Sequence, residues 1–430
     1  MSAPFLILVA AFVVLVLARV PIAFAMLVAA LAYLAAARRD IGLLADQIMN
    51  TLMSNYLLAA IPLFLLAANL MNAGSISDRL FAACHVFVGR IKGGLAQIDV
   101  LVSVLFASMS GSAVADAAGP GMVTIRAMDK AGYPRGFAAA IVAASSVLGP
   151  IIPPSIPMIL YALMANASIA ALFLAGVVPG LLIAALMMVV VWITAERRNF
   201  PIEPPIPRGE RARVLARALL PLGMPVVLLG GIYSGAFTPT EAAAVAALYA
   251  LVLAGVVYRE LGAETLLAAF ADTARQATVI LLMICGAFAV NYAVTAEQLD
   301  KALAAWIAAL RLGPLAFLIV VNLLFLVLGC LIDATTMLLV LVPVLLPTVA
   351  ALGIDPVYFG VVIVVNITIG LVTPPYGLLL FVLAALTKVP LREIVRESWG
   401  LIGSLVAALA LMVAFPSLVL WLPRLLGYVR

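Results

Sequence analysis

Two short polar interruptions lie inside otherwise apolar sequence, and a degenerate copy of the pair returns in the second half of the chain. The first pair is Ser108–Ser112 and Gly149–Pro154, and the second pair is Gly329–Asp333 and Gly370–Pro375. Ser112 and Pro153 have the same separation along the chain as Asp333 and Pro374 (153 − 112 and 374 − 333). One offset of 221 (374 − 153) relates the two copies. Such internal symmetry around broken apolar segments predicts two structural repeats that meet at the breaks.

The rest of the composition places the chain in a membrane. Of its 430 residues 67% are hydrophobic and only 10% are charged, whereas a soluble domain has about 25% charged residues. The first apolar run begins at residue 4 without a basic leader or a cleavage site, so we predict a retained helix. The three cysteines are far apart and have no metal-ligand spacing, which indicates neither a disulfide framework nor a metal cofactor. The net charge of +5 comes from the connections between apolar runs, a membrane pattern and not one of nucleic-acid binding.

Basic residues predict which connections face the cytoplasm. The richest cluster is in the proline-containing segment 196–217, which we interpret as a stiff cytoplasmic connector between two halves. A second, mixed cluster from Lys388 to Glu397 predicts an interfacial helix on the same side.

The chain divides into six segments. We predict N-terminal scaffold helices over 1–42, a first repeat over 43–195, the cytoplasmic connector over 196–217, scaffold helices over 218–258, a second repeat over 259–390 and a C-terminal scaffold helix over 391–430. Within the central helix pair, Thr238 and Glu241 have the spacing of a capping box, with Pro239 at the first helical position.

Each repeat is expected to contain a re-entrant hairpin followed by a broken helix. The hairpins are predicted at about 95–127 and 314–350, and the broken helices at about 136–165 and 357–387. Residues 95–127 are too few for two full spans, since each span needs about 20 residues. An odd number of crossings per repeat would invert the second repeat relative to the first. The fold class is therefore an all-α polytopic membrane protein with two inverted repeats.

Each break exposes backbone groups that a continuous helix keeps paired. The exposed carbonyl ends are partly negative, and the exposed amide ends are partly positive. Carbonyls and hydroxyls together can hold a small hard cation, and the amide ends suit an anionic substrate such as a carboxylate. Glycine, serine and proline also simply kink or pack membrane helices, but matched breaks in two repeats favour a binding site.

Three aspartates lie near the breaks. Asp333 is an acid inside an apolar stretch, which is expensive and usually functional, so we predict a sodium or proton role, with capping of a helix end as the alternative. Asp116 is one turn beyond Ser112 and either faces the same pocket or stabilises a helix N-terminus, and the sequence leaves both open. Asp99 is early in its hairpin arm, where we expect a surface role.

The four motifs together resemble the large membrane subunit of tripartite ATP-independent periplasmic (TRAP) transporters. The resemblance covers essentially the whole chain. It is carried by Ser108–Asp116 (SMSGSAVAD), Gly149–Pro157 (GPIIPPSIP), Gly235–Ala244 (GAFTPTEAAA) and Gly370–Gly377 (GLVTPPYG).

The resemblance implies a function, a location and partners. Such proteins of the bacterial inner membrane use a sodium gradient to import small organic acids. They assemble with a small four-helix membrane subunit, and a soluble periplasmic substrate-binding protein delivers the carboxylate. Because this sequence starts almost directly at the first helix, we expect the small subunit to be a separate chain. The implied fold is that of the ion transporter superfamily, in which an elevator-type transport domain moves against a scaffold in the lipid bilayer.

The resemblance also implies site residues. One sodium site would use Ser110, Gly149, Ile152 and Pro154, and the other would use Gly329, Gly370, Thr373 and Tyr376, with Asp333 beside it. The substrate would lie among Ser108, Ser112, Ser145, Pro153, Asn366 and Pro374.

Two other functions compete with this prediction. A one-component sodium-coupled dicarboxylate or anion symporter would have the same breaks but would need no binding protein. An intramembrane enzyme would need paired acids such as Asp116 and Asp333 within reach of one substrate. The chain has no phosphate loop, nucleophile elbow or metalloprotease motif, so we predict that it is not an enzyme.

Overall fold

The computed structural model describes residues 2–73, 75–204, 206–310, 312–330 and 332–429, and the described secondary structure is entirely helical. Two short apolar helices, α1 (Ala3–Leu17) and α2 (Ile22–Ala36), open the chain and pack against each other. Pro21 stands directly before α2, where its fixed φ and missing N–H suit a helix start. The N-terminal segment is thus a helix pair.

The first repeat begins with a bent span and ends with a long helix. Its elements are α3 (Gly42–Ser54), η1 (Tyr56–Ala59), α4 (Ala60–Asn72), α5 (Ile76–Val88), α6 (Gly94–Ser110), α7 (Ala113–Ala118), α8 (Pro120–Lys130), α9 (Arg135–Ser145), η2 (Ser146–Leu148), α10 (Ile156–Ala165) and α11 (Ile169–Arg198). The span made by α3, η1 and α4 bends by 70° at Asn55. The predicted first hairpin corresponds to α6, α7 and α8, and the predicted first broken helix corresponds to α9, η2 and α10.

Two helices join the repeats. They are α12 (Arg208–Tyr233) and α13 (Pro239–Val252), the latter extended by a π-helical turn, η3 (Leu253–Val257). Thr238 and Glu241 form the predicted capping box, with each side chain bonded to the other residue's backbone N–H. α12 begins at Arg208, inside the predicted connector, because helix-compatible residues follow Pro207 directly.

The second repeat follows the order of the first. Its elements are α14 (Ala263–Ala296), α15 (Leu299–Ala309), α16 (Pro314–Gly329), α17 (Ala334–Ala351), α18 (Pro356–Gly370), α19 (Leu378–Thr387), α20 (Leu391–Ala414) and α21 (Ser417–Leu425). Corresponding helices begin at a nearly constant offset, from 220 for α6 and α16 (314 − 94) to 223 for α5 and α15 (299 − 76). By the same measure α20 is the counterpart of α11, with an offset of 222 (391 − 169).

Two predictions for the C-terminal part are wrong. No separate interfacial helix covers 388–397, because α20 begins at Leu391 directly after Pro390 and continues to Ala414. The segment after the second broken helix is also not one helix, since Phe415 leaves the helical conformation and Pro416, which has no N–H, separates α21 from α20.

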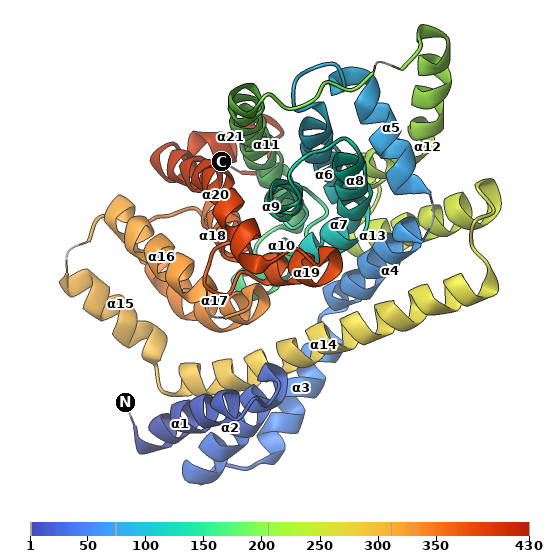
Figure 1. The fold of residues 1–430 in the computed structure, drawn as a ribbon. Helices are drawn as coiled ribbons and strands as arrows, with labels where there is room; N and C mark the ends of the chain where they lie inside the picture. Colours follow the sequence, from blue (N-terminus) through green and yellow to red (C-terminus); the bar gives the residue numbers. More distant parts are fainter. Residues whose placement is uncertain (1, 74, 205, 311, 331, 430) are drawn as a thin grey trace.

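The two repeats pack reciprocally at the centre of the molecule. α10, which follows the first break, packs on α17 of the second hairpin, and α19, which follows the second break, packs on α7 and α9 of the first repeat. Figure 1 shows α7, α10, α18 and α19 gathered in the middle of the molecule. All four elements next to the breaks therefore form one central body.

The long helix α14 lies along one side of this body with α1, α2 and α3, and α4 continues from there towards the centre (Figure 1). In the described part of the chain six helices are long and apolar enough to cross a bilayer, or seven if the bent span is counted. The remaining apolar helices have 10–17 residues, as expected where spans are broken or re-entrant.

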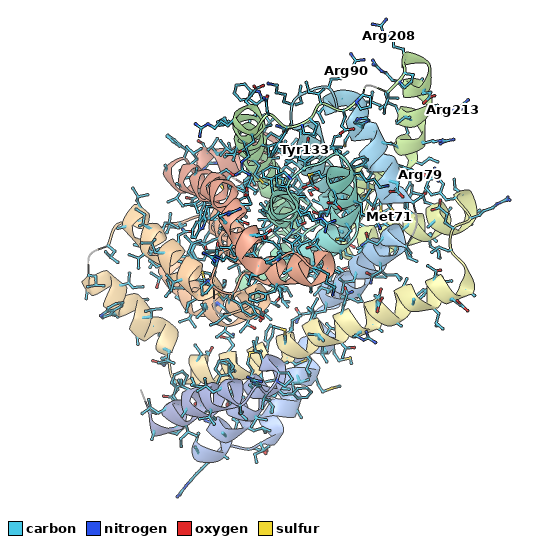
Figure 2. The ribbon with its side chains drawn as sticks, viewed as in Figure 1. Met71, Arg79, Arg90, Tyr133, Arg208 and Arg213 are labelled. Carbon is cyan, nitrogen blue, oxygen red and sulfur yellow. The ribbon has the colours of Figure 1, made fainter. Side chains whose placement is uncertain are left out.

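Basic side chains of the connector and of the turn before α6 lie at one end of the molecule. Figure 2 shows Arg90, Arg208 and Arg213 at the upper edge of the molecule. At the same end Lys92 lies 3.0 Å from Glu196, and Arg198 lies 2.6 Å from Glu397, so the start of α20 is on the side of the connector. This is the end that the sequence predicts to face the cytoplasm.

Candidate functional site

The tip of the first hairpin is in backbone contact with the first helix break. α6 ends at Ser110, and Gly111 turns the chain with a φ of 61°, a conformation that glycine adopts without strain. A Cβ on Gly111 would lie 2.5 Å from the carbonyl oxygen of Pro154, and a Cβ on Gly149 would lie 3.0 Å from the carbonyl carbon of Ser112. Only glycine at both positions permits this approach, which brings the predicted ligands Ser110, Gly149 and Pro154 together.

The first break leaves carbonyl groups unpaired. Residues 149–155 are not helical, and the three prolines among them have no N–H to donate. Within the described part of the chain, five carbonyls of this segment accept no hydrogen bond, those of Gly149, Ile151, Ile152, Pro153 and Pro154. Buried carbonyls nearly always have a partner, so this group of unpaired oxygens is unusual.

The second tip meets the second break in the same way. A Cβ on Gly370 would lie 2.9 Å from the carbonyl oxygen of Gly329, so these two predicted ligands are also in backbone contact. The Gly370 carbonyl accepts a hydrogen bond of 3.2 Å from the Thr373 N–H, and the Thr373 hydroxyl donates to the Ile369 carbonyl at 2.8 Å. Leu331, at this tip, lies outside the described residues.

The two breaks differ in how deeply they are covered. Ser110 and Gly149 are buried, as are Pro153 and Pro154. In the second break Thr373 and Pro374 are half-buried, and Tyr376 is 51% exposed with its ring packed beside Phe381. Of the predicted sodium ligands, Tyr376 is thus the one most open to its surroundings.

The predicted substrate residues fall into two groups. Ser108, Ser112, Pro153 and Pro374 lie at the tips and breaks. Ser145 and Asn366, which are equivalent by the offset of 221 (366 − 145), are fully buried and bind the hairpin arms instead. The Ser145 hydroxyl donates to Asp99 Oδ2 at 2.7 Å, and the Asn366 amide donates to Asn322 Oδ1 at 2.7 Å. These two contacts fasten each broken helix to the first arm of its hairpin.

The three aspartates have different environments. Asp333 is the N-cap of α17, where its side chain accepts hydrogen bonds from the Thr336 N–H at 2.9 Å and from the Thr336 hydroxyl. Asp116 is fully buried on α7 and accepts a hydrogen bond of 2.8 Å from Ser103. The expected surface role of Asp99 is wrong, because Asp99 is only 1% exposed and faces α9.

Two residues that hold the break regions in place, Ser155 and Asn322, were not predicted from the sequence. Ser155 is fully buried, caps α10 by accepting from the Met158 N–H at 3.2 Å, and donates across the break to the Pro150 carbonyl. Its place directly after two prolines, three residues before a helical N–H, was an available capping signal. Asn322 gave a weaker signal, since it is one amide within a 16-residue apolar helix.

Comparisons with known proteins agree on one family. The profile of the tripartite ATP-independent periplasmic transporter, DctM component, matches residues 9–418. The chain belongs to this family. It is 41% identical to the sialic acid TRAP transporter large permease protein SiaM of Vibrio cholerae, over 90% of this chain and 91% of that protein. It is 40% identical to the C4-dicarboxylate TRAP transporter large permease protein DctM of Pseudomonas aeruginosa, over 87% of each chain.

One further relative and one solved structure are also similar to this chain. The ectoine/5-hydroxyectoine TRAP transporter large permease protein UehC of Ruegeria pomeroyi is 38% identical over 85% of both chains. Among solved structures, the YdaH transporter of Alcanivorax borkumensis superposes with a TM-score of 0.58 and covers 86% of this chain and 88% of that one. The sequence identity is 17%, so this similarity supports the fold alone. This TRAP large permease is therefore a multi-pass protein of the inner membrane, and its homologues are transporter permeases and not enzymes.

Proposed function

We propose that this TRAP large permease imports a small organic acid by coupling its movement to a sodium gradient. The observation that carries the proposal is the contact between each hairpin tip and its helix break, where five carbonyls of the first break accept no hydrogen bond among the described residues. Carbonyl and hydroxyl oxygens are the ligands that hard cations such as sodium prefer. Helix ends at the same breaks supply amide groups for a carboxylate.

The relatives support an acid as the substrate. Sialic acid, C4-dicarboxylates and ectoine stand in the names of relatives that are 35–41% identical to this chain, and each of these compounds carries a carboxylate group. We propose the shared group, a carboxylate, as what the site recognises. Ser108 and Ser112 at the first tip, with Pro374 at the second break, would surround it.

We further propose an elevator movement. The hairpins and broken helices pack on one another across the repeats, so they can move as one body. The long helix α14, with α1 and α2, would remain as the scaffold on one side of it (Figure 1). A bound sodium ion at each tip would fix the tip to its break and complete the substrate site.

Family membership also supports two partners. We propose a small membrane subunit beside the scaffold and a periplasmic substrate-binding protein that delivers the acid. Affinity purification of tagged permease from its native host should recover a small membrane protein in equal amount. Proteoliposomes with both membrane subunits should take up substrate only when the binding protein is added. Uptake by the permease alone would instead identify the one-component symporter.

The sodium sites can be tested without knowing the substrate. Purified permease in nanodiscs should melt at a higher temperature in NaCl than in choline chloride, because a ligand that binds only the folded state stabilises it. Thr373→Ala should remove much of this difference. Thr387→Ala is the matched control, since its hydroxyl bonds the carbonyl four residues back, as that of Thr373 does, but lies away from the break.

Asp333→Asn tests the charge at the second site. Asparagine retains the cap of α17, so the melting temperature in choline should remain close to that of the wild type. The gain in NaCl should decrease if the carboxylate contributes to sodium binding. An unchanged sodium effect in both Thr373→Ala and Asp333→Asn would refute the second site.

A further inference from the structure

The interior of the first repeat holds two carboxylates that the hairpin tips do not use. Asp99 on α6 and Asp116 on α7 are 1% and 0% exposed, and Ser103, about one helical turn after Asp99 on α6, donates a hydrogen bond to Asp116. At the equivalent positions in the second repeat, which the same offset of 221 identifies (320 − 99 and 337 − 116), the chain has Val320 and Met337. The acidic pair is therefore specific to one repeat.

Hydroxyl groups from three elements lie at the pair. The Ser103 hydroxyl of α6 donates to Asp116 Oδ2 at 2.8 Å, and the Ser145 hydroxyl of α9 donates to Asp99 Oδ2 at 2.7 Å. Ser146 of η2 directly follows Ser145 and is fully buried. We call these five residues the acidic cluster.

No ion pair compensates the two charges within the described residues. None of the ion pairs found there includes Asp99 or Asp116. Two ionised carboxylates in a low-dielectric interior are strongly unfavourable unless positive charge accompanies them. The two hydroxyl groups that donate to the carboxylates stabilise negative charge without removing it, so the cluster requires a positive species.

A second observation shows where that species would bind. Asp116 Oδ1 and Ser146 Oγ are both fully buried, and neither has a hydrogen-bond partner within the described residues. Ser146 directly follows Ser145, the residue that binds Asp99, so both oxygen atoms lie in the acidic cluster. Nearly all buried polar atoms in proteins are satisfied, so two unsatisfied oxygens beside an uncompensated carboxylate indicate a missing ligand.

We propose that the acidic cluster binds a sodium ion, in addition to those at the two hairpin tips. The donors are carboxylate and hydroxyl oxygens, which suit a hard cation and exclude one that needs nitrogen or sulfur. The cluster would bind its ion through side chains, whereas the tips use mainly backbone carbonyls. This inference rests on the proposed sodium coupling, and it adds an ion that travels with the first repeat.

Direct ion counting tests the proposal. Full-length permease in nanodiscs is equilibrated with radioactive sodium at constant ionic strength, with choline as the replacing cation, and bound ions per chain are counted. Asp116→Asn should bind one ion fewer than the wild type, because the neutral amide loses both the charge and one ligand oxygen. Asp129→Asn is the control, since Asp129 is an exposed partner of Arg135, and its count should not change.

A milder substitution covers the case in which Asp116→Asn does not fold. Ser146→Ala retains both carboxylates and removes only one unpaired hydroxyl, so it should weaken the same ion several-fold without abolishing it. Size-exclusion profiles and cooperative melting identify the variants that fold.

Each outcome decides something different. A wild-type protein that binds no sodium would overturn the proposed coupling itself. A wild-type protein that binds sodium, with an unchanged count in Asp116→Asn and unchanged affinity in Ser146→Ala, would overturn this inference and leave the coupling intact. If the count is unchanged but the pH dependence of melting differs in Asp116→Asn, the cluster holds a proton and the sodium assignment is wrong.

Discussion

The break in the first repeat is buried, whereas the break in the second repeat is partly open. Both breaks use the same backbone devices, namely a glycine before the break and a double proline within it, whereas the tip glycines Gly111 and Gly329 are not at equivalent positions. Their surroundings differ, because acids and hydroxyls fill the first repeat where the second has Val320, Met337 and Leu345. The comparison teaches that the backbone geometry of the breaks is common to both repeats, while the side chains around them have diverged.

The divergence extends to how each broken helix is fastened. Ser145 and Asn366 occupy equivalent positions, and both bind the first arm of a hairpin. In the first repeat the partner is a carboxylate, Asp99, and in the second it is the amide of Asn322. The amide pair carries no net charge and therefore needs no counterion.

The largest effect is expected where the first hairpin tip contacts its break. Gly111→Ala should destabilise the protein most, because Gly111 has a positive φ and its Cβ would lie 2.5 Å from a backbone oxygen. Positive φ alone costs a non-glycine residue about 1–3 kcal/mol. Gly370→Ala lacks the positive φ but would meet Gly329 backbone at 2.9 Å, so its melting temperature should fall less.

Gly132→Ala separates the two causes. Gly132 has a φ of 84° but nothing within 4 Å of its Cβ position, so it reports the backbone cost alone. If Gly111→Ala and Gly132→Ala lower the melting temperature equally, the tip does not press against the break.

The next largest effect is expected at the contact that holds the second broken helix to its hairpin. Asn366→Leu should cost about 1–3 kcal/mol, since it leaves the buried Asn322 side-chain oxygen without its donor. The double variant Asn322→Leu with Asn366→Leu should recover most of the loss, because no unpaired polar group remains. Thermal melting of the two single variants and the double variant forms a complete cycle. Additive losses would show that the two amides act independently.

The sequence predicted the breaks but not their surroundings. Glycine and double proline dictate local backbone geometry, so both tips and both broken helices were visible in the residues themselves. The capping box at Thr238 was visible for the same reason. The burial of Asp99 was not, because it depends on which face of α6 meets α9, and that contact joins residues 46 positions apart (145 − 99). Local chemistry is encoded locally, whereas burial is decided by packing.

A smaller loss of stability is expected when the helix caps that follow the two tips are removed. Ser112 and Asp333 are equivalent by the offset of 221 (333 − 112), and each caps the next helix by accepting from a backbone N–H three residues on. Replacement of either by alanine should cost about 1 kcal/mol. Asp333→Ser should retain the cap and melt near the wild type in choline chloride. If Asp333→Ser melts as low as Asp333→Ala, the charge of Asp333 and not its capping bond stabilises the second tip.

The smallest effect concerns how the repeats are anchored outside the breaks. At the start of α5, Glu260 accepts hydrogen bonds from the Ser75 N–H at 2.7 Å and from Arg79, whose guanidinium stacks on Tyr258. At the start of α15, the equivalent helix, Glu297 accepts only from Tyr33 at 3.2 Å among the described side chains. The first anchor is therefore the stronger, although an ion pair near the surface is worth only about 1 kcal/mol.

The pH dependence of the first anchor follows from its hydrogen bonds. Burial would raise the pKa of Glu260, but the bonds from Ser75 and Arg79 outweigh it, so the pKa lies below its usual value of 4.5. A carboxyl with a lowered pKa stabilises the folded state above pH 4.5, and this contribution is lost as the pH falls through the folded pKa. Glu260→Gln should thus lower the melting temperature at pH 7, and the difference from the wild type should disappear in acid. A difference that persists well below pH 4.5 would mean that the anchor depends on packing of the side chain and not on its charge.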